Sequence, residues 1–500
     1  DDGNYNTAVG YQSLSANCGN ENTAIGYQAL LVNTAGDNTA VGAYALKDMV
    51  EGFDNVAIGM NALGGDLDTT ADGSEGNIAI GKAAMGGNWV TAVSNHNIAI
   101  GHSSMDAAMN GALYNVAVGY NTLTSLTTGD HNTTIGTGSG AAILDGTANT
   151  VLGSGALDLL TSGNHNIAIG MDAANTMDAG ESHNYAIGSD SMGAMDEGAS
   201  GTIDYNIAIG YTALSGGAMS STNSVSGCIA IGHFSLNSTG TNGHAGTIAI
   251  GYNALTACTS GSANTAVGYG SMDALTTGSN NTALGDRSLS GTDDGAGNTA
   301  VGAFAMETGN AGDNNIAVGY NALRLCTGGS NTVIGVNAGD AITTTSDCVL
   351  IGRNAGSAID HNDANGTTIV GRDAGESLTD GIGNTALGYA ALNATTTGNY
   401  NTVVGHEAAK VLPAGANTNT AIGYQSLTAG NNASTDHNTC VGYASGDVIT
   451  SGHSNTIIGS GADPGGATNT NETVIGYDVE GQGSNTVTLG DTNVTAVYMA

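Results

Sequence analysis

Histidine recurs at one fixed place in a sequence that is otherwise poor in groups that can do chemistry. Five histidines stand five residues before the glycine of a recurring string such as "IAIG": His96, His131, His165, His183 and His437. Imidazoles repeated at one position can bind a metal ion or an anion. Because turn histidines facing solvent are far commoner than metal ligands, the pattern favours turns, and we expect no metal site.

Acidic residues cluster in two long stretches between the recurring strings. Asp66, Asp68 and Asp72 lie in "GGDLDTTADGSEG", and Asp196 and Glu197 lie in "GAMDEGASGTIDY". Such carboxylates can bind Ca²⁺, but their spacing lacks the nonapeptide pattern of calcium-binding β-rolls. Loops on a rigid scaffold commonly carry binding, although drift in loop length explains the insertions about as well. We treat both stretches as candidate ligand-binding loops.

Aromatic residues offer a third kind of contact. Tyrosine follows the recurring glycine in 11 places, and the one tryptophan, Trp89, lies in another long stretch, "GGNWVTAVSNH". A row of rings can stack on sugars, but a row along the flank of stacked coils more commonly stacks on itself. We expect the tyrosine row to be structural and assign Trp89 to a candidate ligand-binding loop.

Catalysis has no signature in this sequence. It contains neither a GxSxG nor an HExxH motif, and its acidic residues lie mostly in irregular turns. We expect no enzyme activity and no cofactor. The alternative is a polysaccharide-degrading enzyme that works in a groove between chains.

Composition excludes other classes. Only 7 Lys and Arg oppose 43 Asp and Glu, a formal charge of −36, so nucleic acid is not an expected partner. With 81 Gly, 3 Phe and 1 Trp, any core must be thin and aliphatic, yet 40% hydrophobic residues predict a folded chain. The six cysteines are scattered singly, and no apolar run is long enough to insert into a membrane.

The recurring string organises the whole chain. Its glycine occurs 28 times, starting at Gly10, Gly26 and Gly42, at spacings of 14 to 22 residues that cluster at 17. The residue before it is always Val, Ile or Leu, as at Ile169, and Asn lies four before it in 22 copies, as at Asn166. We call this glycine the motif glycine.

Each position of the motif predicts a structural role. An invariant glycine implies positive φ or a backbone approach too close for a Cβ atom, and Asn suits a left-handed turn and a ladder of amides along stacked coils. Leu or Met lies four residues after most motif glycines, as at Leu14 and Leu30. Where glycine replaces it, an apolar residue follows three positions later, which predicts one continuous hydrophobic column.

The elements that position these residues are short stacked coils. A 17-residue coil has room for two strands of about five residues and two turns. Such a coil encloses little, so several aliphatic ladders would leave apolar surface exposed on a single chain. Association of parallel chains about a common axis would bury that surface, which predicts a homo-oligomer.

The strings "NTAVG", "NIAIG" and "NVAIG" resemble the head repeats of trimeric autotransporter adhesins, the YadA-like heads. The resemblance covers essentially all 28 coils and implies left-handed parallel β-rolls that associate as homotrimers, with the longer period here placing extra residues in loops at one corner. The ending "GSNTVTLGDTNVTAVYMA" is similar to the C-terminal part of tail fibre proteins of marine bacteriophages.

We therefore expect an all-β, parallel β-roll or β-solenoid of about 28 short coils, forming a single domain over residues 1–500, with 477–500 a possible transition to a following domain. The expected function is that of a non-enzymatic fibrous adhesion protein, a shaft outside the cell, on a cell surface or virion tail. It would present loops to a cell-surface glycan or receptor. The alternatives are the polysaccharide-degrading tailspike and, since Thr is frequent, an ice-binding solenoid.

Overall fold

A computed structural model describes residues 3–65, 72–195, 202–216, 224–240, 243–360, 364–428 and 435–498. The chain divides into two compact units, Asp1–Ser262 and Ala263–Ala500. The described residues contain β-strands and turns but no α-helix, and accordingly no helix among them could cross a membrane. The predicted all-β class is confirmed.

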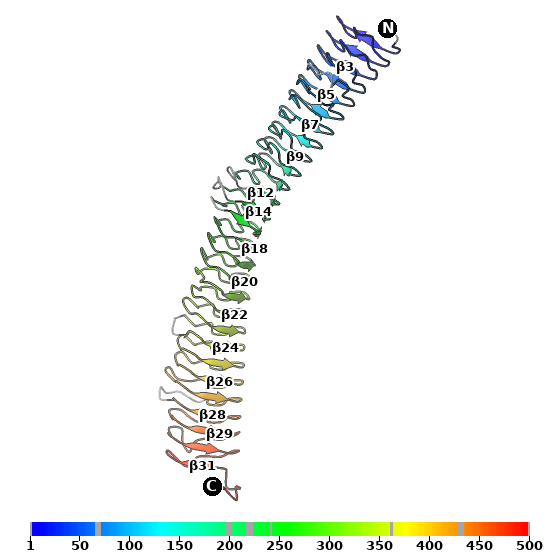
Figure 1. The fold of residues 1–500 in the computed structure, drawn as a ribbon. Helices are drawn as coiled ribbons and strands as arrows, with labels where there is room; N and C mark the ends of the chain where they lie inside the picture. Colours follow the sequence, from blue (N-terminus) through cyan, green and yellow to red (C-terminus); the bar gives the residue numbers. More distant parts are fainter. Residues whose placement is uncertain are drawn as a thin grey trace. The chain divides into compact units, whose positions relative to one another are not determined.

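A three-residue strand precedes every motif glycine of the first unit. Each strand pairs in parallel and in register with the strand of the next coil, for example β1 with β2 and β2 with β3 (Figure 1). The strands are β1 (Thr7–Val9), β2 (Thr23–Ile25), β3 (Thr39–Val41), β4 (Val56–Ile58), β5 (Ile78–Ile80), β6 (Ile98–Ile100), β7 (Val116–Val118), β8 (Thr133–Ile135), β9 (Thr150–Leu152), β10 (Ile167–Ile169), β11 (Tyr185–Ile187), β13 (Ile207–Ile209), β15 (Ile229–Ile231) and β17 (Ile248–Ile250).

A second, smaller sheet lies in the first unit, in the coils with the longest connections. It consists of two-residue strands in the order β12, β14, β16, all parallel: β12 (Ile203–Asp204), β14 (Val225–Ser226) and β16 (His244–Ala245). The repeat pattern of the sequence does not predict these strands.

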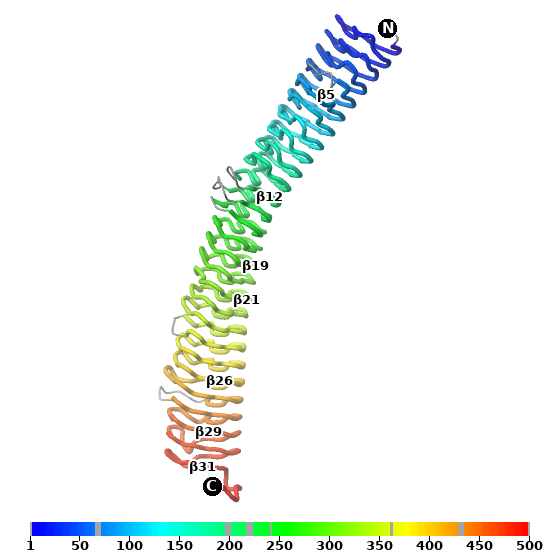
Figure 2. The backbone as a smooth tube through the Cα atoms, viewed as in Figure 1, coloured from blue at the N-terminus to red at the C-terminus, as the bar shows by residue number. Residues whose placement is uncertain are grey.

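The second unit repeats the same construction. Its strands again pair in parallel with the next coil, and the tube in Figure 2 follows the chain from coil to coil. They are β18 (Thr265–Val267), β19 (Thr282–Leu284), β20 (Thr299–Val301), β21 (Ile316–Val318), β22 (Thr332–Ile334), β23 (Val349–Ile351), β24 (Thr368–Val370), β25 (Thr385–Leu387), β26 (Thr402–Val404), β27 (Thr420–Ile422), β28 (Thr439–Val441), β29 (Thr456–Ile458), β30 (Thr473–Ile475) and β31 (Val487–Leu489).

Left-handed residues close each coil and keep its strand short. The motif glycine has a φ of 138° at Gly10, 143° at Gly26 and 137° at Gly42, and a Cβ atom there would collide with the carbonyl of the next motif glycine. Both predicted reasons for the glycine are confirmed. The residues two and four after it, such as Tyr44 and Leu46, also have positive φ. The predicted pair of five-residue strands per coil is therefore wrong, because these turns interrupt extended backbone.

The inside of each coil is narrow and aliphatic. The middle residue of the strand points inward and is buried, as Ala24 and Ala168 are, and so is the Leu or Met four after the glycine, as at Leu30. Leu14, in the first coil, is half-buried. In the coil of Gly136 the site carries Gly140, and a Cβ atom there would meet the Cδ1 atom of Ile143 at 3.0 Å. The predicted compensation is confirmed, since the buried isoleucine fills that space.

The predicted ladder of asparagine amides is also present inside the coils. Asn166 accepts hydrogen bonds at Oδ1 from the backbone and side-chain nitrogens of Asn184, at 3.0 and 3.3 Å. Its own Nδ2 donates to Oδ1 of Asn149 at 3.1 Å and to the carbonyl of Glu181 at 2.7 Å. The left-handed turn predicted for this residue is wrong, because the positive φ belongs to the residue before it, 58° at His165.

Candidate interaction surfaces

Each three-residue strand that precedes a motif glycine has its first and third residues pointing away from the coil interior. Together these residues form what we call the outer sheet face. These positions carry only Thr, Val, Ile, Leu or Tyr in all 28 copies, so the face has no charged residue in a chain of formal charge −36. No described residue at either position is buried. Ile100 is 38% exposed, and Leu284 is 49% exposed. Each unit therefore exposes a continuous uncharged strip.

The two units differ at the first strand position. In the first unit it is aliphatic in many coils, including those of Val56, Ile78, Ile98 and Val116. In the second unit it is threonine in most coils, beginning with β18, β19 and β20. The outer sheet face is thus an aliphatic double row in much of the first unit and a threonine row beside an aliphatic row in much of the second.

Ile169 lies on this face. A position that is aliphatic in every coil suggests burial, but in the single chain Ile169 is half-buried while its neighbour Ala168 is fully buried. The alternation follows from strand geometry, since successive side chains point to opposite faces. The column at Ile169 can be buried completely only by something outside the chain.

Aromatic rings line the corner that follows the motif glycine. Tyr389, His406, Tyr424 and Tyr443 stack in successive coils with ring centroids 4.8 to 5.3 Å apart, and the guanidinium of Arg372 lies 4.5 Å from the first ring. Because each ring covers the face of the next, these faces are closed to a sugar. The prediction that the tyrosine row stacks on itself is confirmed here.

The turn histidines stack in the same way. His165 lies on His183 with centroids 5.1 Å apart, and His183 lies on Tyr205 at 4.9 Å. Among the residues that the structure describes, no three His, Cys, Asp or Glu side chains are grouped so that they could hold a metal ion.

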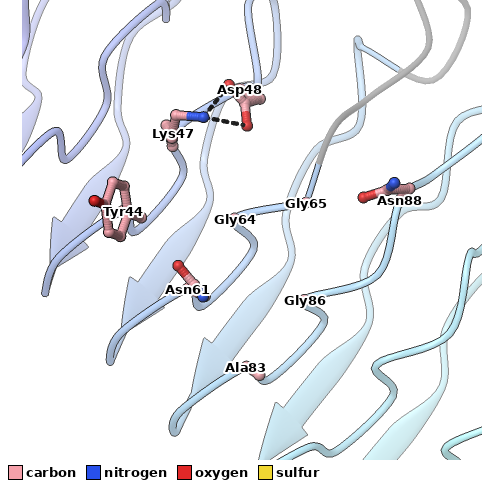
Figure 3. Close-up of a pocket in the computed structure, with 9 residues that line it drawn as sticks. All are labelled: Tyr44, Lys47, Asp48, Asn61, Gly64, Gly65, Ala83, Gly86 and Asn88. Atoms are coloured by element: carbon pink, nitrogen blue, oxygen red, sulfur yellow. Dashed lines mark hydrogen bonds and ion pairs between the residues drawn. The ribbon is translucent and has the colours of Figure 1, made fainter.

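A polar hollow of about 400 Å³ lies where the first patch of long connections begins. Tyr44, Asn61 and Ala83 line it from successive coils, each two residues after its motif glycine (Figure 3). The Tyr44 ring meets Tyr27 edge-on at 5.3 Å, and no ring continues the row into the next coil. The aromatic row therefore ends at the hollow.

Charged and amide groups surround this hollow. Lys47 forms an ion pair with Asp48 at 3.3 Å, and Asn88 lies on the opposite side (Figure 3). Gly64, Gly65 and Gly86 complete the lining, so that part of the wall is bare backbone. An aromatic ring, amides and one ion pair suit a small polar ligand such as a sugar, with hydrogen bonds to hydroxyls and contact to the ring.

Of the acidic residues assigned to candidate ligand-binding loops, the structure describes only Asp72. Asp66, Asp68, Asp196 and Glu197 lie outside the described residues. Asp72 is described, and its Oδ1 accepts the backbone N–H groups of Val50 and Glu51, so it fastens the connection to the preceding coil.

Trp89 is fully buried and belongs to the coil interior, as do Met85 and Met109. A surface ligand cannot touch it. Its assignment to a binding loop was wrong, because the indole is enclosed in the coil interior instead of lying on an exposed connection.

All six cysteines are free and buried: Cys18, Cys228, Cys258, Cys326, Cys348 and Cys440. Burial raises the pKa of Cys228 and Cys348 to about 11 and that of Cys326 to about 12. Thiols of such high pKa are poor nucleophiles at neutral pH.

Comparison of the chain with models of known protein families gave no match, and comparison with curated proteins gave none.

Proposed function

We propose that the chain is a non-enzymatic fibrous adhesion protein that works outside the cell, as part of a tail fibre or a bacterial surface adhesin. In this proposal three copies associate through their outer sheet faces. The assembled shaft then presents polar corners and long connections to a cell-surface glycan or receptor.

The outer sheet face is the observation that carries this proposal. A strip of aliphatic and threonine side chains without one charge is unusual on a chain that carries 43 acidic residues. Large exposed apolar patches on soluble proteins mark interaction sites. Because the strip is the same kind of surface coil after coil, another copy in parallel is the partner that matches it along its length. The number three comes from the resemblance to YadA-like heads.

The test of assembly uses a charge on the face. We expect the parent chain to sediment as a trimer and Ile169→Asp, combined with Ile187→Asp in the paired strand, to weaken association strongly. The matched control is Met171→Asp, two residues further on at a corner and 57% exposed, which should assemble normally. A monomeric parent chain in analytical ultracentrifugation would refute the proposal.

The test of adhesion uses the hollow at Tyr44. We expect Tyr44→Ala and Asn61→Ala to reduce binding of the assembled protein to an array of neutral oligosaccharides. Tyr424→Ala, within a closed stack of rings, is the control that should bind like the parent. Equal binding by all variants would place recognition elsewhere, and no binding by the parent would count against an adhesive role.

One observation favours a second candidate, binding to ice, for the second unit alone. Threonines such as Thr265, Thr282 and Thr299 follow one another in register, and their hydroxyls bond to no other described residue. A regular row of methyl and hydroxyl groups can order water. Thermal hysteresis in the parent, lost in Thr282→Lys but kept in Asp293→Lys at an exposed turn, would support this candidate over self-association.

A further inference from the structure

Glu181 is a buried acid in a place where other coils carry small residues. It lies seven residues before the motif glycine Gly188, where the two preceding coils have Gly146 and Gly163. Glu181 is only 2% exposed, and neither of its carboxylate oxygens has a hydrogen-bond partner among the described residues. A buried carboxylate without partners is costly in free energy, so a group that compensates its charge is expected.

Glu472, a second buried glutamate among the described residues, shows what compensation looks like. Glu472, which is 0% exposed, accepts hydrogen bonds from the backbone of Gly483 at 2.9 Å and from Nδ2 of Asn469 at 3.0 Å. The backbone N–H of Gly465 also donates to both of its carboxylate oxygens, at 3.4 and 3.2 Å. Among the residues that the structure describes, none donates a comparable hydrogen bond to the Glu181 carboxylate.

No basic side chain of the unit is placed to pair with Glu181. The sequence has no Lys or Arg between Lys82 and Arg287. The nearest imidazole in sequence, His183, is stacked between His165 and Tyr205. An external cation is therefore the remaining partner of opposite charge.

A second acidic residue lines a small hollow together with Glu181. Glu181 and Asp204 line a space of about 70 Å³ together with Ala179, Gly180 and Thr202. Asp204 ends β12, the edge strand of the small sheet, and its Oδ1 accepts the backbone N–H of Ser182 at 2.8 Å. The hollow has room for one ion and a water molecule or two, since a water occupies about 30 Å³ in the liquid.

We propose that Glu181 and Asp204 bind one divalent cation of the Ca²⁺ type. Carboxylates, backbone carbonyls and a few waters form the oxygen-rich, irregular ligand set that Ca²⁺ accepts, whereas Mg²⁺ demands near-ideal octahedral geometry and keeps several waters. The ion joins the edge of the small sheet to the preceding coil. This inference does not depend on the proposed adhesive function.

The experiment measures ion binding by the full chain after treatment with a chelator. Isothermal titration with CaCl₂ should show one site per chain with a dissociation constant on the order of 10⁻⁴ to 10⁻³ M, the range of extracellular modules, and MgCl₂ should bind at least tenfold more weakly. Hydrogen exchange should slow at the amide of Ser182 when Ca²⁺ is added.

Glu181→Gln and Asp204→Asn should each abolish the calorimetric signal and the exchange protection. In chelator, Glu181→Gln should melt at or above the parent temperature, because it removes an uncompensated buried charge. Asp178→Asn, an exposed carboxylate in the same connection, and Glu472→Gln should still bind Ca²⁺.

Three results would overturn the inference: no calcium binding by the parent, full binding by Glu181→Gln, or a chelator-treated parent that is stabilised only by lowering the pH. The last would mean that a proton alone compensates Glu181.

Discussion

Each motif asparagine joins successive coils through one amide. Asn166 bonds Asn149 in one coil and Asn184 in the other, and it also holds the carbonyl of Glu181. Because the amide is buried, it supplies the hydrogen bonds that water cannot provide to backbone groups inside the coil. The interior of the coil is thus half polar, with an amide column beside the aliphatic ones.

Replacing Asn166 tests this column. Asn166→Ala leaves the Glu181 carbonyl and an Asn184 N–H without partners and should cost about 1–3 kcal/mol of unfolding free energy. Asn166→Thr should cost less, because Thr367, at the same position of another coil, donates its hydroxyl to the Gly381 carbonyl at 3.0 Å. Denaturant unfolding measures both, and equal losses would show that the hydroxyl does not replace the amide.

The motif glycine allows a similarly sharp comparison. At Gly42, with φ of 137°, an added Cβ atom would lie 2.5 Å from the carbonyl oxygen of Gly59, so Gly42→Ala should cost about 3 kcal/mol or more. Gly138 has φ of 67° and nothing within 4 Å of a Cβ atom, so Gly138→Ala should cost about 1–2 kcal/mol. Calorimetric melting that ranks them in the opposite order would contradict this account.

The buried thiols predict how stability depends on pH in alkaline solution. The pKa values of Cys228 and Cys348 rise from 9.0 to about 11 on folding, because burial disfavours the thiolate. Their contribution is complete below pH 9 and is lost as pH rises towards 11, at up to about 1.4 kcal/mol per pH unit for each thiol. Cys348→Thr should reduce that slope in urea unfolding at pH 9 to 11. An unchanged slope would mean that the thiol ionises equally in both states.

At the residue scale, the sequence predicted the structurally important positions more reliably than the conformation and contacts of the residues there. The glycine and the amide ladder follow from their constancy at one spacing. The left-handed residue is the one before the asparagine, for example His131 or Asp37, and its identity varies so much that no sequence signal marks it. No sequence motif marks Glu181, because its interest lies in the lack of a described hydrogen-bond donor to its carboxylate.

At the scale of the element, the strand is three residues long and has two different faces. The inward side of β10 is Ala168, and the outward side includes Ile169. The sequence fails to distinguish them, because both positions are apolar and the coil is too small for a wide interior. Longer connections built the small sheet of β12, β14 and β16, whose two-residue strands give no periodic pattern to detect.

The two faces respond differently to a charge. Ala168→Asp places a carboxylate in the closed interior and should cost about 3 kcal/mol or more of unfolding free energy. Ile169→Asp, whose side chain can reach solvent, should change the unfolding of the dissociated chain by about 1 kcal/mol or less. Chemical unfolding at a protein concentration where both are monomeric gives the comparison. Similar losses for both would mean that β10 is buried on both sides within one chain.

At the scale of the whole molecule, charge and apolar surface are separated. Apart from Asp204 in β12, the described acidic residues lie outside the strands, while the outer sheet face is uncharged from the first motif to the last. Repulsion between the charged surfaces discourages unspecific association, so the uncharged outer sheet face is the surface available for specific association. The repeat alone predicted the solenoid, but the hollow at Tyr44 depends on side chains from three coils, whose proximity appears only in the structure.

Because each strand pairs with the strands of the adjacent coils, the fold also affects how the gene that encodes it can change. The strand before Gly119 pairs residue for residue with the one before Gly136, and β4 with β5 and β30 with β31 pair in the same register, although the motif glycines of these three pairs are 17, 22 and 14 residues apart. Recombination between two copies of the repeat would remove or duplicate a whole coil and leave every remaining junction of the familiar kind. Length is therefore a heritable trait that can drift in steps of one coil, with no need for compensating mutations elsewhere.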